Sequence, residues 1–338
     1  MAQINKPSEY FNTVLWTTDG TGNKALTTGH STDMVWIKFR DFAYDHRIYD
    51  DVRGVTKKII PNKTDAESTT TDLASFDANG FTVGNNLNTS GEGGLVGWSW
   101  KANGAGVSNT DGSITSTVSA NTTSGFSIVQ WTGTGSNATV GHGLGKEVKF
   151  FITKRTDFSG DNWYAYHSSL GGTKYLHPNK TEAAGTSISP FNNTNPTSTT
   201  ISAGTDLSVS SSTHIAYCFA EKKGFSKFGS YTGNGSTDGT FIYTGFKPAF
   251  IITKKTSATS NWHIYDNQRA NPFNVVSGKL VANTDEAEAV GAECDFLSNG
   301  VKIRASGSDL NGSGASFIYM AFAENPLVST AGVPCTAR

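Results

Sequence analysis

Cysteine is scarce in this sequence, with three residues among 338. Cys218, Cys294 and Cys335 are odd in number and far apart, so they suggest neither a disulfide framework nor the close spacing of metal ligands. Cys218 lies in an apolar run, and we expect it to be a small residue buried in the core.

Charged residues are also few, because Asp, Glu, Lys and Arg together make up 16% of the chain. The formal net charge is −1 at pH 7. A nucleic-acid-binding protein normally carries a basic face or stripe, whereas here we find local pairs such as Lys57–Lys58 and Lys222–Lys223. We therefore expect no nucleic-acid partner.

Long hydrophobic runs are missing as well. No run approaches the ~20 apolar residues that span a bilayer. The first seven residues (MAQINKP) contain no apolar core of a signal peptide. These absences predict a soluble protein that is made in the cytoplasm and does not insert into a membrane.

Glycine, in contrast, is abundant, with 37 residues, and aromatic residues make up 11% of the chain. Few charges and many aromatics argue against disorder. Short apolar runs separated by Gly and polar turn residues predict an all-β protein with many tight connections.

A ten-residue pattern occurs three times, at residues 29–38 (GHSTDMVWIK), 145–154 (GKEVKFFITK) and 245–254 (GFKPAFIITK). Each copy opens with Gly, continues into a short apolar run and ends on Lys. A short apolar run between turn residues is typical of a strand buried on both faces. The pattern indicates a threefold internal repeat.

Each repeat offers about six to eight short strands in roughly 100 residues, the profile of an antiparallel β-sandwich. The predicted fold class is all-β, with three tandem antiparallel β-sandwich repeats of the jelly-roll kind. We expect separate domains, because solenoid repeats are shorter, at ~20–50 residues. The predicted boundaries are 1–102, 124–224 and 225–326 for the repeats, 103–123 for a Gly/Ser/Thr/Asn-rich linker with one weak hairpin, and 327–338 for a C-terminal tail.

The repeated motifs resemble those of a family of virion proteins of tailed bacteriophages, common in phages of cyanobacteria and marine bacteria. The resemblance is clearest at residues 227–235 (KFGSYTGNG) and 319–326 (YMAFAENP). It implies a virion structural protein of the tail-fibre kind and offers no catalytic residues to transfer. The first repeat departs from the pattern, because Trp98-Ser99-Trp100-Lys101 replaces the Ala-Glu ending of the closing strand.

Acidic residues recur at one place in every repeat, after an Asn-Lys-Thr or Asn-Thr step. Paired carboxylates could act in glycoside hydrolysis when they face each other ~5–9.5 Å apart. Three equivalent sets argue against a single active site, and the spacing of Thr64 and Glu67 favours a capped helical turn. These residues are Asp65, Glu67, Glu182, Asp285, Glu286 and Glu288.

The seven histidines lack the spacing of a zinc site. Calcium stays an alternative, because Asp19, Asp111, Asp238 and Asp309 lie in Gly- or Asn-rich loops, although no EF-hand order is present. We predict no catalytic residue, no cofactor and no metal ligand.

Aromatic residues that alternate along one strand of repeats two and three are the candidate contact residues. One face of each strand should join the core, and the other could stack on sugar rings. Burial in the core is the favoured interpretation of these residues, because aromatic side chains dominate sandwich cores. The strand-end residues Lys38, Lys154 and Lys254 are interpreted first as snorkelling side chains and second as ligand contacts. The candidate surface-contact residues are Trp163, Tyr164, Tyr166, Trp262, His263 and Tyr265.

Two classes of function follow. The first is a non-enzymatic virion structural protein, most simply a tail-associated fibre or adhesion component, with a capsid decoration (cement) protein as the alternative. Its partners would be other virion proteins and a host surface glycan, and its location the virion. The second is a carbohydrate-binding lectin or a polysaccharide depolymerase. The threefold repeat leaves the oligomeric state open. The protein could be a homotrimer, or a monomer whose three repeats occupy a threefold position.

Overall fold

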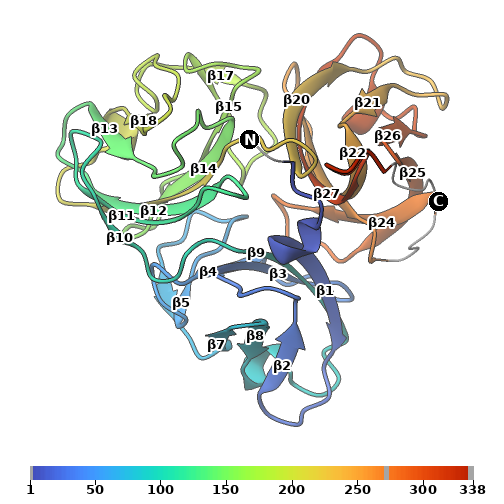
Figure 1. The fold of residues 1–338 in the computed structure, drawn as a ribbon, viewed down its shortest axis with the longest axis horizontal. Helices are drawn as coiled ribbons and strands as arrows, with labels where there is room; N and C mark the ends of the chain where they lie inside the picture. The colour runs from blue at the N-terminus through green and yellow to red at the C-terminus, as the bar shows by residue number, and fades with distance from the viewer. Residues whose placement is uncertain (1–2, 270–273, 334–338) are drawn as a thin grey trace.

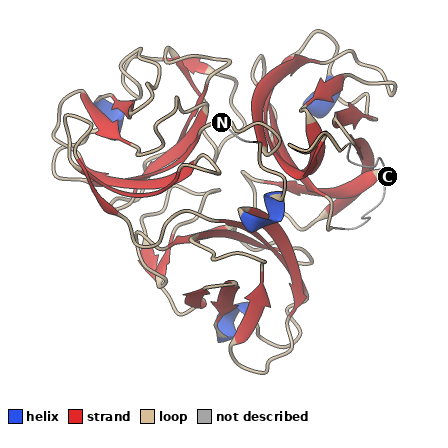
Figure 2. Cartoon of the chain, in the orientation of Figure 1, coloured by secondary structure: helices blue, strands red, loops and turns tan. Residues whose placement is uncertain are grey.

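The structure is a computed structural model that describes residues 3–269 and 274–333. Nearly all of its regular structure is β, in antiparallel sheets, which confirms the all-β prediction (Figure 2). Three lobes surround a common centre (Figure 1). We call them lobe 1 (residues 3–102), lobe 2 (103–224) and lobe 3 (225–269 and 274–333).

Lobe 1 contains a four-stranded sheet in the order β1-β9-β3-β4 and a three-stranded sheet in the order β2-β8-β7. Apolar residues such as Val35 and Phe81 belong to one buried cluster that joins the two sheets. Its elements are η1 (Pro7–Glu9), β1 (Phe11–Thr17), β2 (Lys24–Thr27), β3 (Met34–Phe39), β4 (Arg47–Asp50), β5 (Lys57–Lys58), β6 (Ser68–Thr69), β7 (Leu73–Asp77), β8 (Gly80–Val83), η2 (Asn85–Leu87) and β9 (Gly94–Trp100).

Lobe 2 contains a six-stranded sheet in the order β10-β11-β12-β19-β14-β15 and two-stranded sheets β13-β18 and β16-β17. Its elements are β10 (Val107–Asn109), β11 (Ser116–Asn121), β12 (Phe126–Thr132), β13 (Ala138–Gly141), β14 (Phe150–Arg155), β15 (Tyr164–His167), β16 (Lys174–Tyr175), β17 (Gly185–Thr186), β18 (Thr200–Ala203), η3 (Thr205–Leu207) and β19 (Thr213–Phe219).

Lobe 3 contains one eight-stranded sheet in the order β20-β27-β22-β23-β24-β25-β26-β21. Its elements are β20 (Ser226–Thr232), β21 (Phe241–Tyr243), β22 (Phe246–Lys255), β23 (Trp262–Asp266), β24 (Val276–Val281), β25 (Ala289–Leu297), β26 (Gly300–Ile303), α1 (Ser308–Asn311) and β27 (Ser316–Pro326).

One strand order occurs in all three lobes: β1-β9-β3-β4, β12-β19-β14-β15 and β20-β27-β22-β23. The three ten-residue patterns supply the third strand of each set, β3, β14 and β22. Alternate residues of β14 face different clusters, because Phe150 and Ile152 join the central cluster while Phe151 joins the core of lobe 2. The prediction of a strand buried on both faces is therefore confirmed.

The central cluster takes residues from all three lobes. At its middle lie Trp100, Phe219 and Phe322, the last residues of the closing strands β9, β19 and β27 that belong to this cluster. Their ring centroids are 6.3 Å (Trp100–Phe219), 5.8 Å (Trp100–Phe322) and 5.7 Å (Phe219–Phe322) apart. The expectation of three separate domains is wrong in this respect, because the apolar face of each sheet is covered by the other two lobes.

The segment 103–123, predicted as a linker, contains two strands of lobe 2. Strand β10 pairs with β11, and β11 pairs along its whole length with β12. The hairpin predicted around Asp111 exists, but Val118 is buried at 4% exposure. The Gly/Ser/Thr composition misled the prediction, because small polar residues also suit the edge of a sheet.

Candidate functional site

Each of the three patterns ends in a fully buried lysine, Lys38, Lys154 or Lys254. The Nζ of Lys154 donates to the carbonyl oxygens of Asp161 (2.6 Å) and Thr64 of lobe 1 (3.1 Å). Burial lowers the pKa of all three lysines to about 8. They are not snorkelling residues, as the sequence suggested, because a neighbouring lobe covers the end of the strand.

Lys254 of lobe 3 repeats this arrangement. Its Nζ donates to the carbonyl oxygens of Ser260 (2.7 Å) and of Thr181 in lobe 2 (3.0 Å). Lys38 instead donates within its own lobe, to the carbonyl oxygens of Phe39 (2.6 Å) and Phe42 (3.1 Å). Two of the three buried lysines thus connect one lobe to another.

The segments that begin at Asn62, Asn179 and Asn283 form the other side of these contacts. In each lobe the Asn Oδ1 accepts the backbone N–H at the start of the fourth strand, from His46 (3.0 Å), Trp163 (3.0 Å) and Trp262 (2.7 Å). The segment 62–67 forms a turn followed by residues without regular structure, rather than the predicted helical turn.

Backbone hydrogen bonds at the ends of these segments close a ring of lobes. The N–H of Glu67 donates to the Thr156 carbonyl in lobe 2 (2.7 Å), and that of Ala184 to the Thr256 carbonyl in lobe 3 (3.0 Å). The N–H of Glu288 then donates to the Arg40 carbonyl in lobe 1 (2.7 Å). We call the three contact regions seam 1–2, seam 2–3 and seam 3–1.

Two of the predicted contact residues lie in these seams. Trp163 donates its indole N–H to the Ile60 carbonyl of lobe 1 (3.0 Å), and Trp262 donates to the His177 carbonyl of lobe 2 (3.0 Å). His46 completes the set at 3.0 Å from the Val281 carbonyl oxygen of lobe 3. Its Nδ1 accepts the indole N–H of Trp36, so Nε2 carries the proton.

Seam 1–2 contains a buried ionic network. Arg53 and Asp50 are 1% and 0% exposed, with 2.5 Å between Nε and the carboxylate, and Glu67 lies 3.1 Å from Arg53 Nη1. From lobe 2, the Tyr217 hydroxyl donates to Asp50 at 2.6 Å. This bond joins the closing strand of lobe 2 to lobe 1.

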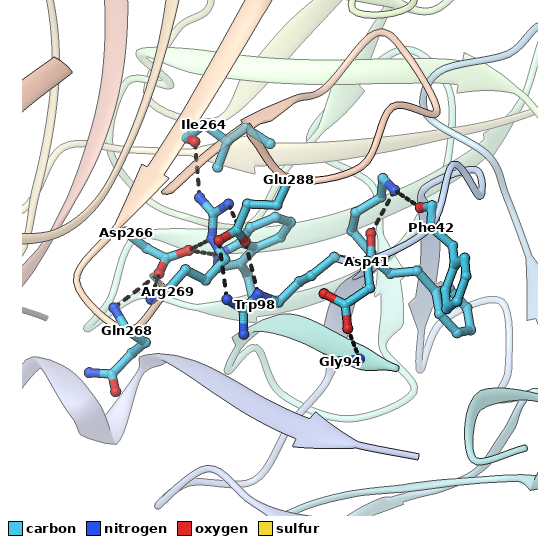
Figure 3. Close-up of polar contacts among 12 residues, drawn as sticks. Asp41, Phe42, Gly94, Trp98, Ile264, Asp266, Gln268, Arg269 and Glu288 are labelled. Carbon is cyan, nitrogen blue, oxygen red and sulfur yellow. Dashed lines mark hydrogen bonds and ion pairs between the residues drawn. The ribbon is translucent and has the colours of Figure 1, made fainter. Parts of the chain in front are cut away.

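Seam 3–1 contains the equivalent network (Figure 3). Arg269 and Asp266 are both fully buried, with 2.5 Å between the arginine Nε and the carboxylate, and Glu288 lies 3.2 Å from Arg269 Nη1. From lobe 1, the indole N–H of Trp98 donates to Asp266 at 2.9 Å, and Arg40 holds Glu288 through two bonds of 2.8 and 3.1 Å. Glu67 and Glu288 therefore each form structural ion pairs with arginines in their own seam.

Seam 2–3 has no counterpart of the Asp–Arg pair among the described residues. His167 and Leu170 stand at the positions of the aspartate and the arginine. The Nδ1 of His167 accepts the N–H of Ser169 (3.1 Å), so its Nε2 donates to the Tyr319 carbonyl of lobe 3 (3.2 Å). This seam is the least ionic of the three at this position.

For five of the six strand aromatics the structure agrees with the favoured core interpretation and not with the alternative of surface contact. Trp163, Tyr166, Trp262, His263 and Tyr265 are at most 4% exposed. One face of their strands is covered by the second layer of the lobe and the other by a neighbouring lobe. No alternation of polar and apolar residues could reveal this second cover.

Tyr164 is the exception, because it is half-buried and lines a pocket in lobe 2. Its hydroxyl donates to Asp206 at 2.8 Å. Burial, with the adjacent Asp206, raises the pKa of this tyrosine, so the hydroxyl stays protonated. The pocket has a volume of about 200 Å³.

The loop aspartates considered for calcium are each bonded to nearby side chains. Asp19 binds Lys24 (2.5 Å), Asp238 binds Lys302 (2.7 Å), and Asp309 accepts the Ser260 hydroxyl (3.2 Å). Asp111 accepts an amide N–H from Asn109 (2.9 Å). Within residues 3–269 and 274–333, no group of three or more His, Cys, Asp or Glu is placed to hold a metal ion.

Two of the cysteines are free and buried, and burial raises the pKa of both Cys218 and Cys294. The core position predicted for Cys218 is confirmed, whereas Cys335 lies outside the described residues. The helices in the described part of the chain are all too short to cross a bilayer.

A model of the family described as "Domain of unknown function (DUF7483)" matches residues 6–326. The chain belongs to this family. The match spans the three lobes as one unit, in agreement with their shared core. No curated protein matches the chain, and no solved structure does.

Proposed function

We propose that this DUF7483 chain is a threefold internal repeat whose lobes close on one another, and that it acts by contact rather than by catalysis. Three observations support the repeat: the common strand order, the buried lysines, and the asparagine segments that make the same bonds at each seam. We assign each lobe to the jelly-roll class of β-sandwich, which lobe 3 would build from its one eight-stranded sheet.

The ring of seams is the observation that carries a structural role. Buried ionisable groups often mark an active site, but here Lys154, Lys254, Arg53, Arg269 and Glu288 are bonded across or along the seams. Their chemistry is used to fix the lobes in place. A rigid triangular body suits an assembled particle.

The particle we propose is that of a tailed bacteriophage, on the basis of the resemblance at residues 227–235 and 319–326. A tail-associated fibre or adhesion component, made in the host cytoplasm and bound to other virion proteins, is the first placement. Repeated lobes could also bind a surface in a multivalent way, which can raise weak contacts by ~10²–10⁴.

A capsid decoration protein is the second placement, and the triangular arrangement favours it (Figure 1). One chain whose three lobes surround a centre can cover a threefold position of a head lattice as a monomer. The same argument favours a monomer over a homotrimer in solution.

Cryo-electron microscopy of purified particles that carry this chain tests the proposal. We expect density for the three-lobed body on the tail, or on the head lattice in the second placement. Absence of the chain from purified particles, or release of reducing sugar from host polysaccharide by the isolated protein, would contradict a structural role.

A further inference from the structure

We propose that lobe 2 binds an uncharged saccharide in the pocket that Tyr164 lines. The polar wall residues are Arg155, Asp161, Asn162, Tyr164 and Asp206, and Leu207 and Val209 also line the pocket. The inference goes beyond the structural role and stands on this pocket alone.

The polar atoms of the pocket suit hydroxyl groups. A sugar hydroxyl both donates and accepts, so it can bridge a carboxylate and an N–H group. Asp206 uses Oδ2 for the Tyr164 hydroxyl, and nothing else in the described chain is bonded to its side chain, so Oδ1 is available as an acceptor. Asn162 holds the Asn179 amide with its oxygen, which leaves its own NH₂ as a donor.

The charges of the pocket select against anions. Arg155 is the one cation in the wall, and it pairs with Asp157 (2.9 Å) and Asp161 (3.5 Å). When Asp206 is included, the negative charges of the carboxylates outnumber the single positive charge of Arg155. A phosphate, sulfate or uronic acid would meet like charge, whereas a neutral ring would not.

An exposed aromatic ring lies against the wall residue Arg155 and close to Gly160, and we take it as the rim of the site. Phe158 is 47% exposed, and the Arg155 guanidinium lies 4.6 Å from its ring centroid. The electron-rich face of an aromatic ring attracts the slightly positive C–H face of a sugar. Lys154 holds this loop by its bond to the Asp161 carbonyl, so the rim is fixed before any ligand arrives.

The other lobes change these residues. Lobe 1 retains the exposed aromatic as Phe42 but places Arg47 where Tyr164 lies, and Arg47 pairs with Asp72 (3.0 Å). Lobe 3 has Ala258 in place of Phe158 and the buried His263 in place of Tyr164. The combination of rim aromatic, tyrosine and free carboxylate belongs to lobe 2 within the described residues.

The test is a titration of the full chain with the methyl glycosides of glucose, galactose and mannose, in which saturation-transfer NMR measures binding. Glucuronic acid serves as the anionic counterpart. We expect one of the neutral glycosides to bind with a dissociation constant of about 1 mM, an affinity expected of one sugar ring held by a few bonds.

Asp206→Asn should weaken that binding about tenfold, because the amide oxygen can keep the tyrosine bond while its NH₂ replaces the acceptor. Phe158→Ala should weaken it by a similar factor. The matched variants Phe42→Ala in lobe 1 and Asp309→Asn in lobe 3 should leave it unchanged, and thermal melts establish that all four variants fold.

The inference is overturned if none of the neutral glycosides binds at about 20 mM, if glucuronic acid binds more tightly, or if Phe42→Ala has the effect of Phe158→Ala. Particle location and saccharide binding are separate measurements. If no saccharide binds, the proposed structural role is unaffected. If the chain is absent from the particle, the proposed saccharide site is unaffected.

Discussion

Every histidine of the chain is buried, and burial lowers the pKa of each. The pKa falls from 6.5 to about 4 for His30, His167, His214 and His263, and to about 3 for His46. These side chains are neutral in the folded protein at pH 5, whereas the unfolded chain binds protons there.

The contribution of these histidines to stability should therefore be complete above pH 6.5 and should be lost as the pH falls from 6.5 toward 4. Burial raises the pKa of Asp33 and Asp51, which acts in the opposite direction, but these are two groups against seven histidines. Denaturant titrations at pH 7, 6, 5 and 4.5 check this. A free energy of unfolding that stays level or rises on acidification would refute it.

His263→Phe provides the matched variant for that series. Neither ring nitrogen of His263 has a hydrogen-bond partner among the described residues, so the change removes a titrating group without breaking a bond. The number of protons taken up on unfolding, obtained from the slope of the free energy of unfolding against pH, should decrease by about one.

The buried ion pairs offer a second residue-scale prediction. Arg269→Met leaves Asp266 fully buried beside Trp98 without its counterion, and should cost about 3–5 kcal/mol in the free energy of unfolding. The double variant Asp266→Leu/Arg269→Met should recover much of that loss, since it removes both charges. Chemical denaturation measures both.

Lys6→Ala is the control, because Lys6 and Glu9 form an exposed pair with 71% and 48% of their side chains accessible. It should change stability by less than about 0.5 kcal/mol. A loss below about 1 kcal/mol for Arg269→Met would mean that seam 3–1 does not depend on its network.

At the scale of elements, a substitution that removes a hydrogen bond in one seam should loosen that seam and leave the other two unchanged. Trp163→Phe keeps an aromatic side chain but leaves the Ile60 carbonyl of seam 1–2 without its donor, at a cost of about 1–2 kcal/mol. Hydrogen exchange of the Glu67 amide in that seam should become faster, while the Ala184 amide of seam 2–3 should not change. Trp262→Phe should give the reverse pattern, and equal acceleration in both seams would contradict independent contacts.

Strands β10 and β11 test the revised status of residues 103–123. The side chain of Val118 is buried in the core of lobe 2 and Val107 is 68% exposed, so Val118→Ala should cost about 1–3 kcal/mol and Val107→Ala less than about 0.5. Thermal melts of both variants decide between a strand and a linker. If neither substitution changes the melting temperature, the segment acts as a linker.

The elements also show how far sequence reasoning reaches. The buried strands β3, β14 and β22 were predictable because a short apolar run between turn residues has few alternatives. The buried Trp163 and Lys154 were not, because their cover comes from another lobe. A hint existed, since identical Lys endings at three distant positions are unusual for side chains exposed to solvent.

At the scale of the whole molecule, the central cluster decides how the lobes behave. Trp100, Phe219 and Phe322 contact one another across the three lobes. Loss of one lobe would expose the apolar faces of the other two sheets, so partial unfolding should be costly. The central claim is that three similar lobes form a single cooperative body.

Differential scanning calorimetry of the full chain tests this claim most directly. The account predicts one transition, with a calorimetric enthalpy equal to the van't Hoff enthalpy. Two or three resolved transitions, or a calorimetric enthalpy about three times the van't Hoff value, would contradict it and restore three independent domains.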